Sequence, residues 1–250
     1  MARRQYKNPP IEEAVCEIRF AAGPEWDLTF PSRFYERIKD QYPGKPRQQA
    51  LMEAQLQAAP RVENPMFQLR QESAKLLFPN ADERRLVGIG PNVLSVHVLR
   101  PYTGWEDFRS RIEEAYLAYR KAADPKAVTR IAVRYINRIV IEGTSAELDD
   151  YFTVSPQLPP NLALNMAVFL NRVESVFDDE PITLTTTFGS ADAPDQKLAF
   201  LLDLDVTRDW SPGILPLEEL MGQIDELRRR EREAFEATIT NRTREVFDAT

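Results

Sequence analysis

Two aspartates have the type and spacing that could bind a metal ion. Asp203 and Asp205 are two positions apart in KLAFLLDLDV, so in a strand both carboxylates point to the same face. Carboxylate oxygens are ligands for Mg²⁺ and Ca²⁺, and a carboxyl group whose pKa is raised by burial can act as a general acid or base. A metal-dependent hydrolase built on this pair, with further oxygen ligands from other strands, is therefore one functional hypothesis.

Three arginines form a series along the strand predicted for TRIAVRYINRIVI at the midpoint of the chain. Arg130, Arg134 and Arg138 share one face of that strand. Guanidinium forks suit carboxylates and phosphates, which favours a nucleotide or small-molecule sensor. The alternative is cross-strand pairing with Asp203 and Asp205. We favour pairing, because charged side chains that are buried in a sheet need partners of opposite charge.

Tyr135 and Asn137 alternate with the arginines and so lie on the other, apolar face of the same strand. Asn137 is the unusual residue there, because a buried amide must find hydrogen bonds. One interpretation is that Asn137 holds a neighbouring backbone group, and we favour it. The other is that Asn137 and Tyr135 join the arginines in binding a ligand.

The remaining reactive side chains indicate no catalytic site. His97 is the one histidine, which excludes a multi-histidine zinc site, and no nucleophile motif accompanies it. Cys16 falls on the apolar face of a predicted strand, where a free cysteine behaves as a small hydrophobe. We therefore expect no catalytic residues and no cofactor.

The composition predicts a soluble globular protein of the cytoplasm. Of 250 residues, 43% are hydrophobic and 28% are charged, and the net charge of −7 argues against nonspecific binding to nucleic acid. No segment has the roughly 20 apolar residues that span a bilayer. A single cysteine agrees with a reducing compartment. The arginine run Arg228–Arg232 is interspersed with glutamates, which is typical of a solvated helix face.

The order of predicted elements is strand, helix, several strands and long helix, and it occurs twice. We expect an α+β fold with two similar halves, 1–126 and 127–250, in one compact unit, with antiparallel sheets and the long helices on one side. The order is similar to the duplicated fold of the TATA-binding protein, as an analogy of topology. Strands are predicted for IEEAVCEIRF, ALMEAQLQ, MFQLRQE, AKLLFP, RRLVGIG, NVLSVHVLR, TRIAVRYINRIVI, NMAVFLNRVESVF, ITLTTTF and KLAFLLDLDV, and helices for FPSRFYERIKDQYP, WEDFRSRIEEAYLAYRKAA, SAELDDYF and the closing segment 216–247.

Five segments spread along the chain resemble a sporadically distributed, uncharacterised family of bacterial proteins. They are YKNPPIEEAVCEIRF, RPYTGWEDF, RIAVRYINRI, LLDLDV and FEATITN. The resemblance implies a full-length member, and it supplies no catalytic residues because no activity is established for the family. A patchy distribution of this kind implies a setting in mobile elements or bacterial defence.

Taken together, these features favour a non-catalytic cytoplasmic binding or regulatory protein that acts through a protein partner. The alternatives are a nucleotide or small-molecule sensor that uses the arginine-lined sheet face with Tyr135 and Asn137, and a metal-dependent hydrolase around Asp203 and Asp205. The sequence does not indicate the oligomeric state.

Overall fold

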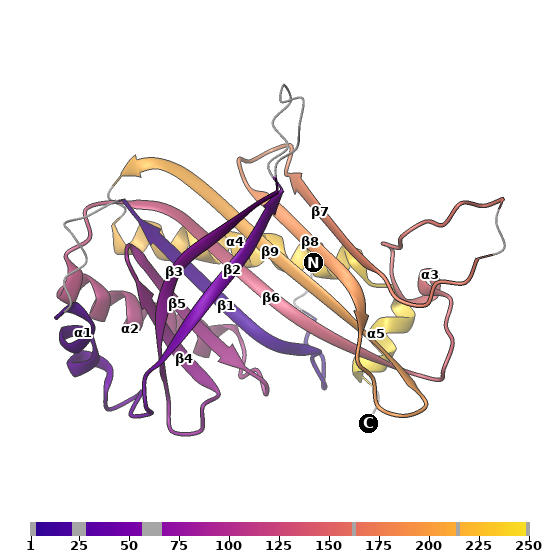
Figure 1. Cartoon of the computed structure of the whole chain (residues 1–250), viewed down its shortest axis with the longest axis horizontal. Coiled ribbons are helices and arrows are strands. Elements are labelled where there is room, and N and C mark those ends of the chain that lie inside the picture. The colour runs from indigo at the N-terminus through magenta and orange to yellow at the C-terminus, as the bar shows by residue number, and fades with distance from the viewer. Residues whose placement is uncertain (1–3, 22–28, 57–66, 162–163, 214–215, 249–250) are drawn as a thin grey trace.

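The computed structural model is an α+β fold in which one antiparallel sheet of nine strands has its helices on one face (Figure 1). The structure describes residues 4–21, 29–56, 67–161, 164–213 and 216–248. The strands lie in the order β2-β3-β4-β5-β1-β6-β9-β8-β7. In chain order they are β1 (Ile11–Phe20), β2 (Arg47–Leu56), β3 (Phe67–Pro79), β4 (Arg85–Gly90), β5 (Val93–Leu99), β6 (Val128–Glu142), β7 (Leu170–Val176), β8 (Thr183–Ala191) and β9 (Lys197–Gly213).

Two long helices cover the middle of the sheet, and shorter helices pack beside them. An acidic first turn favours the start of both long helices, because carboxylates complement the helix dipole there. None of the described helices is both long and apolar enough to cross a membrane. In chain order the helices are α1 (Phe30–Ile38), α2 (Trp105–Ala123), α3 (Leu148–Tyr151), α4 (Leu217–Thr238) and α5 (Asn241–Asp248).

The sheet has an apolar face under the helices because its strands alternate in residue type. In β6 the residues Ile131, Val133, Tyr135, Asn137 and Ile139 are buried, and the residues that alternate with them are partly or fully exposed. This side of the sheet packs on the apolar rows of α2 and α4. The core therefore lies between the sheet and the helices, as expected for an α+β fold.

Before residue 126 the order is strand, helix, four strands and a helix, and after it the order is strand, helix, three strands and two helices. The two halves meet at the pairing of β1 with β6. One core cluster crosses this junction, since it contains Ile18 and Phe34 of the first half and Val206 and Leu220 of the second. A second cluster lies around Phe188 and belongs to the second half. The halves thus share one continuous sheet and a common core.

Several predicted elements differ from the observed ones. The strand expected over 165–177 begins only at Leu170, and the helix expected over 145–152 is limited to Leu148–Tyr151. MFQLRQE and AKLLFP were expected as separate strands, but β3 runs continuously through both. The closing segment was expected as one helix, but it breaks between α4 and α5, where Ile239 is extended and forms a β-bridge with Phe152. The break follows Thr238, whose hydroxyl donates a hydrogen bond to the Ala234 carbonyl. The poor helix propensity of threonine is consistent with an end at this point.

Candidate functional site

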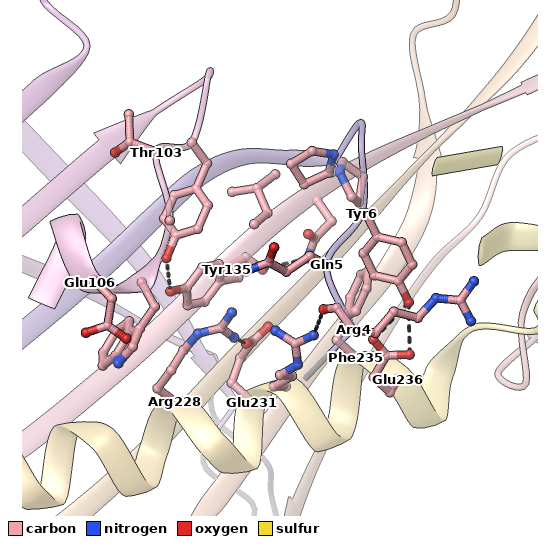
Figure 2. Close-up of a pocket in the computed structure, with 18 residues that line it drawn as sticks. Arg4, Gln5, Tyr6, Thr103, Glu106, Tyr135, Arg228, Glu231, Phe235 and Glu236 are labelled. Carbon is pink, nitrogen blue, oxygen red and sulfur yellow. Dashed lines mark hydrogen bonds and ion pairs between the residues drawn. The ribbon is translucent and has the colours of Figure 1, made fainter. Parts of the chain in front are cut away.

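The helix-covered side of the molecule contains a cavity of about 460 Å³ (Figure 2). Its floor is β6, its walls are the start of α2 and one face of α4, and the N-terminal segment 4–11 closes its remaining side. Charged and aromatic side chains line it in similar numbers, and a cleft of this volume is large enough for a small molecule. We therefore take this cavity as the candidate functional site.

Aromatic rings make up much of the cavity wall. Tyr102 lies before α2, Trp105 is the first residue of α2, and Tyr135 comes from β6. The hydroxyl groups of Tyr102 and Tyr135 are 2.8 Å apart and hydrogen-bonded, and their rings meet edge to face with centroids 5.6 Å apart. Phe108 packs edge to face against both rings. These contacts fix the relative positions of the aromatic rings in the wall.

Arg228 of α4 is the most buried cation at the cavity. Its side chain is 14% exposed, and its guanidinium carbon lies 4.2 Å from the centroid of the Tyr135 ring. It also donates a hydrogen bond to the carboxylate of Glu231. Burial acts to lower the pKa of Arg228, but the charge of Glu231 outweighs it, so the guanidinium stays charged. A charged fork stacked on an aromatic ring is preorganised to bind an anion.

Glu231 is the partner of this arginine and is itself 2% exposed. Burial raises the pKa of Glu231 to about 7, against the opposing charges of Arg228 and Arg232. Near neutral pH this carboxyl group therefore exists in both forms. In its neutral form it leaves the charge of Arg228 uncompensated.

The N-terminal segment is fastened over the cavity by contacts to the C-terminal helices. Tyr6 donates a hydrogen bond to Glu236 of α4 at 2.8 Å, and the Asn8 amide donates to the Phe247 carbonyl at 2.9 Å. Arg232, one turn after Arg228 on α4, donates to the Arg4 carbonyl. Figure 2 shows Arg4 and Tyr6 on the side of the cavity opposite Thr103. The segment thus forms one wall of the cavity.

Of the predicted ligand-binding residues, Tyr135 and Asn137 line this cavity. The side-chain nitrogen of Asn137 donates to the carbonyls of Tyr135 and Leu202, at 3.3 and 3.1 Å. These bonds satisfy the buried amide, as the favoured interpretation expects. They leave the side-chain oxygen as the group that Asn137 can offer to a ligand.

The three arginines of β6 lie on the opposite face of the sheet and do not line the cavity. Arg134 forms a two-pronged ion pair with Asp203, at 2.8 and 2.6 Å. The Arg130 guanidinium is 3.9 Å from the Asp209 carboxylate, and Arg138 donates to the Asp192 carbonyl. The structure therefore divides the predicted ligand-binding set between two faces.

The predicted metal-binding pair also lies on this opposite face. Asp205 faces Arg134 across the strand pair, but the guanidinium fork of Arg134 contacts Asp203. Burial raises the pKa of Asp205 to about 6, and within the described residues its buried Oδ1 has no hydrogen-bond partner. No group of three or more His, Cys, Asp or Glu residues among the described residues is arranged to hold a metal ion.

We call this opposite side of the sheet the polar face, and it is strongly curved. Lys75 of β3 forms an ion pair with Glu17 of β1, although β4 and β5 lie between these strands. A flat sheet would separate the two strands by roughly 14 Å, so the sheet must curl for the contact to form. Figure 1 shows β2 and β3 crossing in front of β1. Burial acts to raise the pKa of Glu17, but Lys75 and Arg19 outweigh it and hold that pKa below its usual value.

A serine, a histidine and a glutamate on the polar face are arranged as in a hydrolase triad. His97 Nε2 is 2.9 Å from the Ser95 hydroxyl, and His97 Nδ1 is 2.8 Å from Glu13 Oε1. Ser95 is nevertheless fully buried, and a side-chain carbon added at Gly88 would lie 2.3 Å from its hydroxyl. A substrate has no access to this hydroxyl in the structure. We therefore assign the three residues a structural role in the curved part of the sheet.

The sequence reasoning missed Arg228 and Glu231. The expectation of a solvated face holds for Arg229, which is 47% exposed, but it is wrong for Arg228 and Arg230, whose side chains are 14% and 11% exposed. A signal was present, because Glu231 continues the apolar row of α4 at helical spacing, four residues after Leu227 and four before Phe235. A charged residue in such a row indicates a buried polar site.

Comparison with protein-family models gave no match, and comparison with curated proteins gave none either. The family resemblance of the five sequence segments therefore stays a prediction.

Proposed function

We propose that the chain is a cytoplasmic, non-catalytic binding protein that takes a small organic anion with a planar ring into the cavity between segment 4–11, α2 and α4. The observation that carries this proposal is Arg228, a buried charged guanidinium stacked on Tyr135 at the cavity. Burial raises the pKa of its counter-ion Glu231 to about 7, so this carboxyl group is partly protonated near neutral pH. The protein thus holds a positive charge that an incoming anion can use.

The chemistry of the wall defines the class of ligand. Arg228 and Arg232 are one helical turn apart and both line the cavity, so they can contact two oxygens of one carboxylate, sulfonate or phosphate. Tyr102 and Trp105 offer ring surfaces against which a planar group can stack. Nucleotides and aromatic carboxylates or sulfonates share these features.

A thermal-shift screen with matched compounds tests the proposal. Each planar anion is paired with a neutral analogue of the same ring, such as an aromatic carboxylate with its amide or a nucleotide with its nucleoside. We expect anions to raise the melting temperature and their neutral analogues to raise it much less, because binding to the folded state stabilises it. A screen in which no planar anion raised the melting temperature would contradict the proposal.

A protein partner is a second candidate, and one surface favours it. The large apolar side chains that are exposed among the described residues all come from residues 158–176, in and before β7. Exposed apolar patches of this kind often mark protein interaction sites. In this second candidate function, the bound ligand would regulate the protein partner. A sensor in the mobile-element or defence setting that the family resemblance implies would act in this way.

A further inference from the structure

Strand β7 is an open edge of the sheet. It pairs with β8 on one side and ends the strand order on the other. Its apolar side chains are exposed: Leu170 by 75%, Val173 by 51% and Val176 by 65%. The backbone groups of an edge strand are a template for another strand, and proteins usually guard such an edge. An apolar edge that lies open is therefore a surface for strand addition.

The residue sequence of β7, LNRVESV, is complementary to itself when it is read in the opposite direction. Val173 is at the centre, and Arg172 and Glu174 flank it with opposite charges. Leu170 and Val176 are the apolar ends of the strand. In an antiparallel pair centred on Val173, each residue therefore meets a residue of matching character.

We propose that β7 pairs with β7 of a second copy of this chain around a twofold axis at Val173. Arg172 of one copy then lies opposite Glu174 of the other, and Leu170 lies opposite Val176. These directly opposed positions are where cross-strand contacts stabilise a sheet. The two sheets become continuous across the dimer, as the isologous contact of a twofold dimer allows.

Neighbouring registers are excluded by charge. A twofold axis perpendicular to the sheet keeps each side chain on its own face. The axis must therefore pass through a residue and not between two residues, and the next possible registers have it at Arg172 or at Glu174. An axis at Arg172 would oppose two arginines, and an axis at Glu174 would oppose two glutamates, which is destabilising. In the monomer, Arg172 contacts the Thr187 hydroxyl at 3.4 Å, at the outer limit of a hydrogen bond, and can turn to the partner copy.

Charge-reversal variants test this register by sedimentation velocity over a series of protein concentrations. We expect the native chain to dimerise in roughly the micromolar range, because one strand pair buries a small area. R172E places two glutamates opposite each other across the axis in each half of the interface, and E174R places two arginines there. Both variants should be monomeric at concentrations where the native chain is a dimer.

Two rescue experiments separate specific pairing from general damage. An equimolar mixture of R172E and E174R should form a heterodimer, and the double variant R172E/E174R should form a homodimer, because both restore opposite charges. A native chain that stays monomeric at high micromolar concentration would overturn the proposal. This holds even if β7 is then found to bind a different protein. Dimers of R172E or E174R as stable as the native dimer would overturn it too.

Cysteine cross-linking locates the axis independently of charge. V173C puts two cysteines directly opposite each other, where the distance between α-carbons in an antiparallel pair suits a disulfide. S175C is the matched control, because its two copies would be roughly 13 Å apart. We expect mild oxidation to link V173C and not S175C, and Cys16 is buried and does not compete. Equal cross-linking of both variants, or of neither, would overturn the register.

Discussion

At the scale of single residues, the pairing of Glu231 with Arg228 couples proton binding to ligand binding. Glu231 faces Arg228, Arg232 and Glu236 of its own helix, and Arg228 lies over Tyr135 of β6. When Glu231 is ionised, it competes with an anionic ligand for Arg228. When it is protonated, the positive charge is available to the ligand.

Anion affinity should therefore fall as the pH rises through the pKa of Glu231, which is about 7. For an aromatic sulfonate, whose own charge is constant, we expect the dissociation constant to rise by about tenfold between about pH 6 and about pH 8. E231Q should bind more tightly at the higher pH and lose this dependence. Isothermal titration calorimetry across this range measures both effects.

The control for this prediction is E233Q, which alters an exposed glutamate of the same helix that pairs with Arg229. It should keep the pH dependence of the native chain. A pH dependence that persisted in E231Q would assign the proton to another group and contradict our account of the pair.

The free energy of unfolding should also depend on the protonation of Glu231. The pKa of Glu231 is above its ordinary value, so the folded state holds a proton that the unfolded state releases between about pH 4.5 and about pH 7. The contribution of Glu231 to the free energy of unfolding is therefore fully present at acid pH and is lost as the pH rises to about 7. E231Q should lack this pH dependence, so the native chain should lose stability relative to E231Q between about pH 5 and about pH 8 in urea unfolding.

At the scale of elements, the polar face depends on close contact between β4 and β5. A side-chain carbon at Gly88 would lie 2.3 Å from the Ser95 hydroxyl and 2.8 Å from a methyl group of Leu77. G88A should therefore lower the free energy of unfolding by about 1 to 3 kcal/mol, since the strands must separate to admit the methyl group. Chemical denaturation monitored by circular dichroism measures this loss.

Gly222 supplies the matched control. It lies in α4, and a side-chain carbon there would meet nothing within 4 Å. G222A should raise the free energy of unfolding by about 0.5 to 1 kcal/mol, because alanine has the better helix propensity. Equal effects of G88A and G222A would show that the close approach at Gly88 is not needed.

The strands and long helices could be predicted from sequence because their side chains repeat with the period of the element. β6 alternates from Ile131 to Glu142, and the apolar row of α4 has helical spacing. The break at Ile239 could not be predicted in the same way. It depends on a β-bridge to Phe152, a residue far away in the sequence, and local helix propensity does not predict a contact of this kind.

The cavity was predictable in part. Tyr135 and Asn137 were singled out because they share the apolar face of a strand, and both line the cavity. Arg228 was missed because neighbouring arginines pair with glutamates on the helix surface. Which arginine of α4 comes to lie over Tyr135 depends on how α4 is rotated over β6, which is a property of packing.

At the scale of the whole molecule, one curved sheet separates three regions. The cavity lies on the helix-covered side, the polar face carries the ion pairs of β6 and β9, and the open edge at β7 is distant from β6 in the strand order. The ligand site and the edge are built from different elements. If the chain does not dimerise through β7, the proposal of a ligand site is therefore unaffected. If no anion binds in the cavity, the proposal of a dimer is likewise unaffected.

The central claim is that Arg228 binds the anionic group of a ligand, and calorimetric titration of R228Q tests it most directly. The control is R229Q, which alters the next residue along the helix, exposed and paired with Glu226 and Glu233. With the best planar anion from the screen, R228Q should lose at least tenfold in affinity and R229Q should bind as the native chain does. Native-like binding by a folded R228Q would contradict the account.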